Sequence, residues 1–273
     1  IDVNPANGEL YLKEMNRQQI HVYSLDGKFK HSFTFPEGKR MSRMCLFSPD
    51  YLIAEQESKV PDDQDANFYP YLLVSTRDGH LDSLDYVQKR NILVKLIVNA
   101  ENHSYAYLLE PSLIRNGSRF YIGNPDSDTL FAMNPDRTLE PLLVRTPSHS
   151  EEGNKYGLFL RGAAGAYFFL TKQPMEVPMN SIESLDLKSE EWLYDCRTQE
   201  VCRYLLKNKD DASKRVEGIM FFCYPEDCGL AVLKSEDLMD AYEAGQLSGE
   251  LKEIAAGLKA DDNPVLMLIH FKK

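Results

Sequence analysis

Short apolar runs separated by polar turns extend along most of the chain, and hydrophobic and polar residues alternate within many of them. Alternation with a period of two predicts β-strands that bury one face. Residues 9–27 align with residues 119–137 without a gap, at an offset of 110 residues. Both copies contain a short strand, a polar turn, a second strand and an Asp-containing turn, followed by third strands at Phe29–Phe35 and Leu139–Val144. The pattern predicts a repeated antiparallel unit.

Less regular copies of this unit fill the rest of the chain. Their expected strands are Tyr51–Ala54, Tyr71–Ser75, Ala166–Leu170, Trp192–Asp195, Glu200–Leu206, Gly218–Phe222 and Leu230–Leu233. A further apolar strand should open each unit, at Met44–Phe47, Ala106–Leu109, Leu158–Leu160 and Ile219–Phe222. A unit of four strands that recurs about every 50 to 60 residues is typical of a β-propeller, in which each unit forms one blade. A β-sandwich is the alternative, but it has no reason to repeat at a constant offset. The sequence favours an all-β propeller.

The C-terminal segment has a different, helical pattern. Ser235 is expected to cap a helix that runs to about Ala244 and stops at Gly245. Ser248 opens a second helix, and one apolar stripe is expected along it, formed by Leu247, Leu251, Ile254 and Leu258. Val265–Phe271 then returns as a strand. Residues 235–260 are therefore predicted to be a helical insertion in the last blade of a single propeller domain spanning residues 1–273.

Charge narrows the range of partners. The chain has 31 basic and 42 acidic residues, a net charge of −11. Domains that bind polyanions usually present a basic face, so nucleic acids and anionic membrane surfaces are excluded as expected partners. No apolar stretch is long enough to span a bilayer. Attachment to a membrane would then require a lipid anchor outside this sequence.

Cysteine and histidine positions give no metal or catalytic motif. Two cysteine pairs bracket turns, Cys223 with Cys228 and Cys196 with Cys202, and each pair reads either as a disulfide or as two small buried thiols. The chain lacks paired C-x2-C spacings, and its six histidines are scattered singly. It also lacks a G-x-S-x-G nucleophile motif. We expect no catalytic residue, no metal site and no cofactor.

Several segments resemble a known family. They are residues 69–79, residues 124–131 (Asn-Pro-Asp-Ser-Asp-Thr-Leu-Phe), residues 144–148, residues 240–256 and residues 262–268. Together they are similar to six-bladed β-propeller proteins of Bacteroidales. The resemblance implies a TolB-like propeller made as an envelope lipoprotein, in the periplasm or at the outer membrane, in a family whose members mostly lack an established activity. About five units are present where the family implies six, so we expect one N-terminal blade to lie outside this sequence.

The resemblance also selects candidate binding residues. Asn124, Asp126 and Asp128 cluster at a strand turn inside a matching segment, although stabilisation of the turn itself is the simpler role. Arg145 and Arg161 can hold a carboxylate or a sugar through forked hydrogen bonds, or can tie one blade to the next.

Two functions fit the sequence. The first is a non-catalytic binding scaffold of the cell envelope, with a small molecule, a glycan or an envelope protein as its partner. The alternative is a calcium-dependent lactonase or esterase, which also uses six blades and would need carboxylate and amide ligands that converge on a central channel. Glu14 and Asn124 occupy equivalent repeat positions and are the two ligands that the sequence offers for it.

Overall fold

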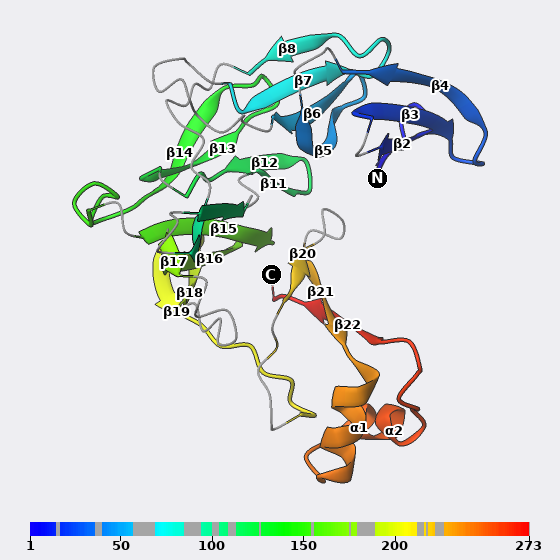
Figure 1. The fold of residues 1–273 in the computed structure, drawn as a ribbon, viewed down its shortest axis with the longest axis vertical. Helices are drawn as coiled ribbons and strands as arrows, with labels where there is room; N and C mark the ends of the chain where they lie inside the picture. The colour runs from blue at the N-terminus through cyan, green and yellow to red at the C-terminus, as the bar shows by residue number, and fades with distance from the viewer. Residues whose placement is uncertain are drawn as a thin grey trace. The chain divides into compact units, whose positions relative to one another are not determined.

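The protein is described by a computed structural model (Figure 1). The structure describes residues 1–14, 17–35, 40–56, 69–84, 94–99, 104–108, 113–125, 127–153, 156–174, 176–178, 189–211, 216, 218–221 and 227–272. The chain divides into two compact units. The first comprises Ile1–Leu93 with Asn134–Leu139, and the second comprises Val94–Met133 with Glu140–Lys273.

The first unit contains two four-stranded antiparallel sheets in which neighbouring strands follow one another in sequence. The first sheet consists of β1 (Asp2–Asn4), β2 (Glu9–Glu14), β3 (Gln19–Ser24) and β4 (Phe29–Thr34). The second consists of β5 (Met41–Ser48), β6 (Tyr51–Gln56), β7 (Tyr71–Ser75) and β8 (Leu81–Ser83). Both sheets contribute to one core, in which Tyr11, Ile20, Met41 and Leu52 are fully buried.

The second unit repeats this strand order twice. One sheet consists of β11 (Leu113–Asn116), β12 (Arg119–Ile122), β13 (Thr129–Met133) and β14 (Leu139–Val144). The next consists of β15 (Tyr156–Ala164), β16 (Tyr167–Pro174), β18 (Glu190–Asp195) and β19 (Glu200–Arg203). Their shared core includes Tyr121 and Phe168, whose rings meet edge to face with centroids 4.7 Å apart.

The last sheet contains the helical hairpin. It consists of β20 (Met220–Phe221), β21 (Cys228–Leu233) and β22 (Val265–His270). Helices α1 (Ser235–Glu243) and α2 (Gly249–Ala256) lie between β21 and β22, as predicted (Figure 1). They pack on each other through a small core of their own, which includes Leu238, Ala241, Leu247, Leu251 and Ala255.

Two details of the helical prediction need correction. Lys234, not Ser235, occupies the N-cap of α1, and the Ser235 hydroxyl instead donates to the carbonyl groups of Asp262 and Asn263 at 3.0 and 2.9 Å. The hydroxyl thereby ties the start of α1 to the segment before β22. Ile254 does not share the buried stripe of Leu251, because its side chain is 38% exposed against 7% for Leu251.

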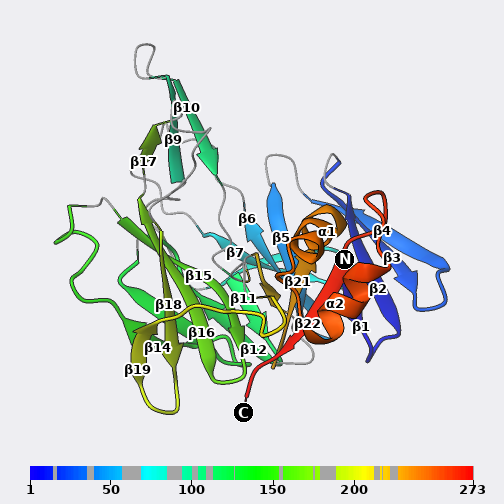
Figure 2. The same ribbon diagram turned by 90° about the horizontal axis from the view of Figure 1, so that it is seen from below.

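A small mixed sheet was not predicted. Strand β9 (Val94–Asn99) pairs antiparallel with β10 (Ser104–Leu108) and parallel with β17 (Glu176–Pro178) (Figure 2). The run Ala106–Leu109 was expected to open a blade, but β11 takes that place. The apolar residues of β10 form a hairpin with those of β9, and periodicity alone does not distinguish such a hairpin from the first strand of a blade.

Among the described residues, five antiparallel sheets with strands in sequence order make up most of the fold. A short antiparallel meander of this kind is the blade of a β-propeller. The predicted fold class, an all-β propeller with a helical hairpin inserted in its last blade, is confirmed.

Candidate functional site

A polar cavity among the described residues lies beside the sheet β15-β16-β18-β19 and has a volume of about 410 Å³. That is the lower part of the size range of small-molecule sites. Residues of this sheet and of the segments that follow it line the cavity: Arg161, Thr171, Glu191, Tyr204, Leu205, Leu206, Val216, Gly218, Ile219 and Phe221. We refer to it as the Arg161 cavity.

Strand geometry places the polar side chains of the cavity in one row. Thr171 on β16 is the cross-strand partner of Glu191 on β18. Arg161 on β15 lies at a register shift between Leu160 and Gly162. A bulge of this kind re-aims a side chain relative to its neighbours. Alternation along β16 places Gln173 on the same face as Thr171.

A continuous hydrogen-bond chain joins these residues. Arg161 donates from Nε to the Thr171 hydroxyl at 3.2 Å and from Nη2 to Gln173 Oε1 at 3.0 Å. The Thr171 hydroxyl donates to Glu191 Oε2 at 3.0 Å, and the Tyr204 hydroxyl lies 3.4 Å from the same oxygen. Thr171 and Gln173 are each only 3% exposed. Buried polar groups that satisfy one another in this way hold their neighbours in fixed orientations.

Aromatic rings form the apolar side of the cavity. Phe169 lies two residues before Thr171 on the same face of β16. Its ring meets Tyr204 edge to face at 5.3 Å and packs against Phe221 at 4.5 Å and Phe271 at 5.1 Å between centroids. Gly162 gives Phe221 its space, because a Cβ at this position would overlap the Phe221 ring.

The charges of the lining favour a neutral, hydroxyl-rich ligand. Arg161 contributes one positive charge and Glu191 one negative charge, so among the described lining residues the two balance. Hydrogen-bond donors and acceptors alternate along the row, and a hydroxyl group can both donate and accept. A polyanion would meet the carboxylate of Glu191, and a cation would meet the guanidinium of Arg161.

The other predicted site residues lie elsewhere in the second unit. Asn124 and Asp128 line a separate cavity of only about 10 Å³, which is the space of about one water molecule. Asp128 accepts a hydrogen bond from the backbone of His149 at 2.5 Å, and its carbonyl oxygen accepts one from the Arg145 backbone at 2.7 Å. Asp126 lies outside the described residues. The binding role of these residues stays a prediction.

Arg145 joins two consecutive sheets of the second unit. Its side chain donates to the carbonyl oxygen of Tyr156 at 3.1 Å and forms an ion pair with Glu152, which Lys172 also contacts. Burial alone would raise the pKa of Glu152, but the hydrogen bonds and charges of Lys172 and Arg145 outweigh burial and lower this pKa below its usual value of 4.5. The Arg145 side chain is only 8% exposed. These contacts agree with the structural role that the sequence left open for Arg145, and its binding role stays a prediction.

The remaining predicted residues are placed as follows. Glu14 lies in the first unit, where its carboxylate is 3.2 Å from His21 Nε2 and 3.5 Å from Arg17 Nε. Cys196 and Cys202 are free thiols, so the disulfide interpretation of this pair is wrong, and Cys202 is exposed and not a buried thiol. Cys223 lies outside the described residues, and its pairing with Cys228 stays a prediction.

Sequence reasoning found Arg161 but missed its partners. The usable signal was weak: the apolar run 167–170 is followed by Thr171, Lys172 and Gln173 in the same expected strand. Thr171 and Gln173 share one face of that strand, but three consecutive polar residues do not by themselves indicate a polar row on one face. The sequence around Tyr204 and Glu191 gives no comparable indication of a polar site. Glu191 reaches Thr171 only through the pairing of β16 with β18.

No protein-family model and no curated protein matches this chain. Among solved structures, a "Putative exported protein" from Bacteroides fragilis is similar in fold, with a TM-score of 0.66 and 13% identity over 99% of this chain and 76% of that chain. A member of the DUF4221 family from Bacteroides vulgatus has a TM-score of 0.53 and 10% identity, over 97% of this chain and 76% of that chain.

At these identities the similarity shows the fold alone. Both neighbours have propeller-type folds and both come from Bacteroides, whereas the six-bladed family suggested by the sequence stays a prediction. Among the described residues, no helix has the length and apolar character needed to cross a membrane.

Proposed function

We propose that this protein is a non-catalytic binding protein of the cell envelope that holds a neutral, hydroxyl-rich small molecule, such as a glycan fragment, in the Arg161 cavity. The observation that carries the proposal is the row Arg161–Thr171–Glu191 beside the rings of Tyr204 and Phe221. Sugars present hydroxyl groups at their edges and C–H groups on their faces. A cavity with a polar row and an aromatic side is complementary to both surfaces.

The composition of the lining supports binding over catalysis. The described lining residues include neither histidine nor cysteine. Glu191 already accepts hydrogen bonds from Thr171 and Tyr204. A carboxylate held by two donors in the resting protein is suited to fixing a geometry, whereas a general base must reach a substrate proton.

An envelope location is part of the same proposal. The Bacteroides fragilis neighbour is described as exported, and the segments matched in the sequence resemble envelope lipoproteins. We place the protein in the periplasm or at the outer membrane, as a lipoprotein.

A thermal-shift screen tests the function. The full chain is screened against neutral oligosaccharides, peptidoglycan fragments, peptides and calcium. A ligand that binds only the folded state at about a hundred times its Kd adds about 2.7 kcal/mol of stability. We expect neutral saccharides to shift the melting temperature. A shift with calcium alone would contradict the proposal and favour the lactonase alternative.

Matched arginine variants locate the binding. Arg161→Gln is expected to weaken saccharide binding at least tenfold in calorimetry, because a charged donor leaves the polar row. The control is Arg197→Gln at the β18–β19 turn, where Arg197 contacts Asp195 and the Tyr167 ring and does not line the cavity. Equal affinities of the wild type and Arg161→Gln would place the ligand elsewhere.

A further inference from the structure

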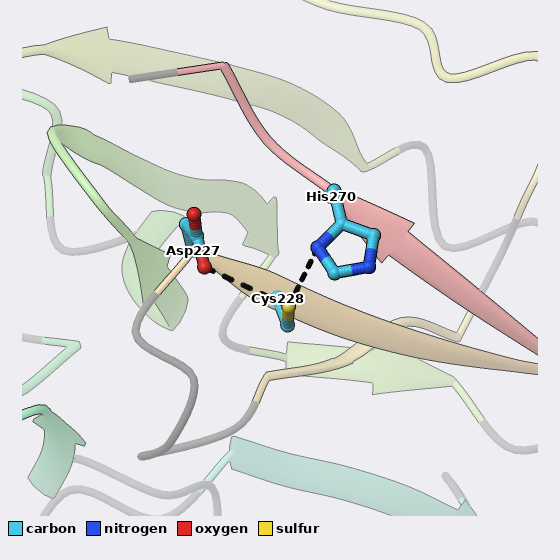
Figure 3. A group of neighbouring side chains, drawn as sticks. All are labelled: Asp227, Cys228 and His270. Atoms are coloured by element: carbon cyan, nitrogen blue, oxygen red, sulfur yellow. Dashed lines mark hydrogen bonds between the residues drawn. The ribbon is translucent and has the colours of Figure 1, made fainter.

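A second cluster of side chains lies at the end of the last blade, outside the Arg161 cavity. Asp227, Cys228 and His270 bring a carboxylate oxygen, a sulfur and an imidazole nitrogen within 4.8 Å of one another (Figure 3). Cys228 Sγ lies 3.1 Å from His270 Nδ1 and 3.7 Å from Asp227 Oδ1. Forty-two residues separate Cys228 from His270 in sequence, which is why no motif spacing revealed the cluster.

Backbone pairing fixes the geometry of the cluster. Cys228 begins β21 and His270 ends β22, and the two residues are direct cross-strand partners. The backbone N–H of Phe271 donates to the Asp227 carbonyl oxygen at 2.8 Å and holds the end of the ladder closed. Because neighbouring residues of a strand point to opposite faces, the Phe271 ring packs among the aromatic rings while His270 projects away from them.

We propose that Asp227, Cys228 and His270 form a zinc site. Zinc binds thiolate sulfur at about 2.3 Å and imidazole nitrogen or carboxylate oxygen at about 2.0–2.2 Å. Tetrahedral angles then place a nitrogen or oxygen ligand about 3.5–3.7 Å from the sulfur. The distance from Cys228 Sγ to Asp227 Oδ1, 3.7 Å, lies within this range, and the distance to His270 Nδ1, 3.1 Å, is shorter, so the imidazole has to move outward when the ion binds. A mixed sulfur, nitrogen and oxygen donor set suits zinc better than calcium or magnesium.

Burial favours a metal site over a catalytic cysteine. The Cys228 side chain is fully buried, and the Asp227 carboxylate neighbours the sulfur. In a catalytic triad the carboxylate instead orients the histidine through its other ring nitrogen. His270 is exposed, which gives an ion a route from solvent. Zinc binding releases the Cys228 thiol proton to solvent, and a water molecule is the fourth ligand. The bound ion then links β21 to β22, the two strands that flank the helical hairpin.

Cobalt titration of the reduced full chain tests this site, because a thiolate bound to Co²⁺ gives a charge-transfer absorption band. We expect one equivalent of Co²⁺ to produce the band and one equivalent of Zn²⁺ to abolish it. Cys228→Ser should remove the band. His270→Ala, at an exposed position that should leave folding intact, should weaken Zn²⁺ binding at least tenfold.

Two controls keep the test specific to the cluster. Cys202→Ser removes an exposed free thiol, and His80→Ala removes an exposed imidazole that lies 3.6 Å from Asp82; both variants should bind like the wild type. A band that survives in Cys228→Ser, or no band in the wild type, overturns the proposal. So does a count of three free thiols in the purified protein, because a Cys223–Cys228 disulfide would then occupy the sulfur.

Discussion

At the scale of single residues, the Arg161 cavity depends on a close approach between Gly162 and Phe221. The three atoms nearest to a Cβ built at Gly162 all belong to the Phe221 ring. Phe221 lines the cavity and packs on Phe169, which precedes Thr171 by two residues on the same face of β16. A side chain at position 162 would therefore displace one wall of the site.

Gly162→Ala is expected to destabilise the protein by about 1–3 kcal/mol, the usual cost of overpacking a core, and to weaken ligand binding. Chemical denaturation measures the first effect and calorimetry the second. Gly257→Ala is the matched control, because a Cβ there meets only a carbonyl oxygen at 3.7 Å, an ordinary contact. Unchanged stability in Gly162→Ala would show that Phe221 does not hold this position.

Glu152 should make stability depend on pH. Its folded-state pKa is lowered below 4.5, so its ion pairs with Arg145 and Lys172 contribute stability above the usual pKa and lose it as the pH falls below about 4.5. Glu152→Gln should cost about 1–3 kcal/mol at neutral pH, because a hydrogen-bonded charge is lost. Below the pKa that Glu152 has in the folded protein, the wild type should no longer be more stable than Glu152→Gln.

Denaturation of both proteins between pH 7 and pH 3 checks this expectation. Glu140→Gln, at an exposed position of β14, is the control and should follow the wild type throughout. A constant stability difference between Glu152→Gln and the wild type across this range would contradict the assignment.

At the scale of elements, the sequence predicted most strands and both helices. Gap-free repetition identified β2 and β3 with β12 and β13, because each strand alternates apolar and polar residues. One failure came where an apolar run is compatible with two pairings. Residues 106–109 have the sequence pattern of a blade strand, but residues 106–108 lie in β10 and pair with β9, whereas β11 pairs with β12 through a short turn.

Two residues of the helical hairpin can test whether burial in the structure or the apolar pattern of the sequence better predicts a residue's contribution to stability. Leu251→Ala should destabilise the hairpin by about 2–4 kcal/mol, since Leu251 is buried in its small core. Ile254→Ala should cost much less, because Ile254 is half exposed although it belongs to the same predicted stripe. Hydrogen exchange of the α1 and α2 amides distinguishes the two variants. Equal effects would mean that the two positions are buried alike.

At the scale of the whole molecule, sequence periodicity was sufficient for the fold class and insufficient for the site. A propeller is built from strands that pair with their neighbours in sequence. The hydrophobic pattern that predicts the fold therefore lies within each short segment of the chain. The Arg161 cavity is formed by residues from four strands, β15, β16, β18 and β20, and from the segments between β19 and β20. Only strand pairing brings Arg161, Thr171 and Glu191 together. The zinc ligands are further separated, because α1 and α2 lie between Cys228 and His270 in the chain.

Hydrogen–deuterium exchange with and without a saccharide from the screen shows whether the ligand occupies the Arg161 cavity. We expect slower exchange in β15, β16 and β18 and in residues 204–206, with little change in residues 124–153. Protection confined to residues 124–153 would contradict this expectation and would assign binding to the turn of Asn124 and Asp128.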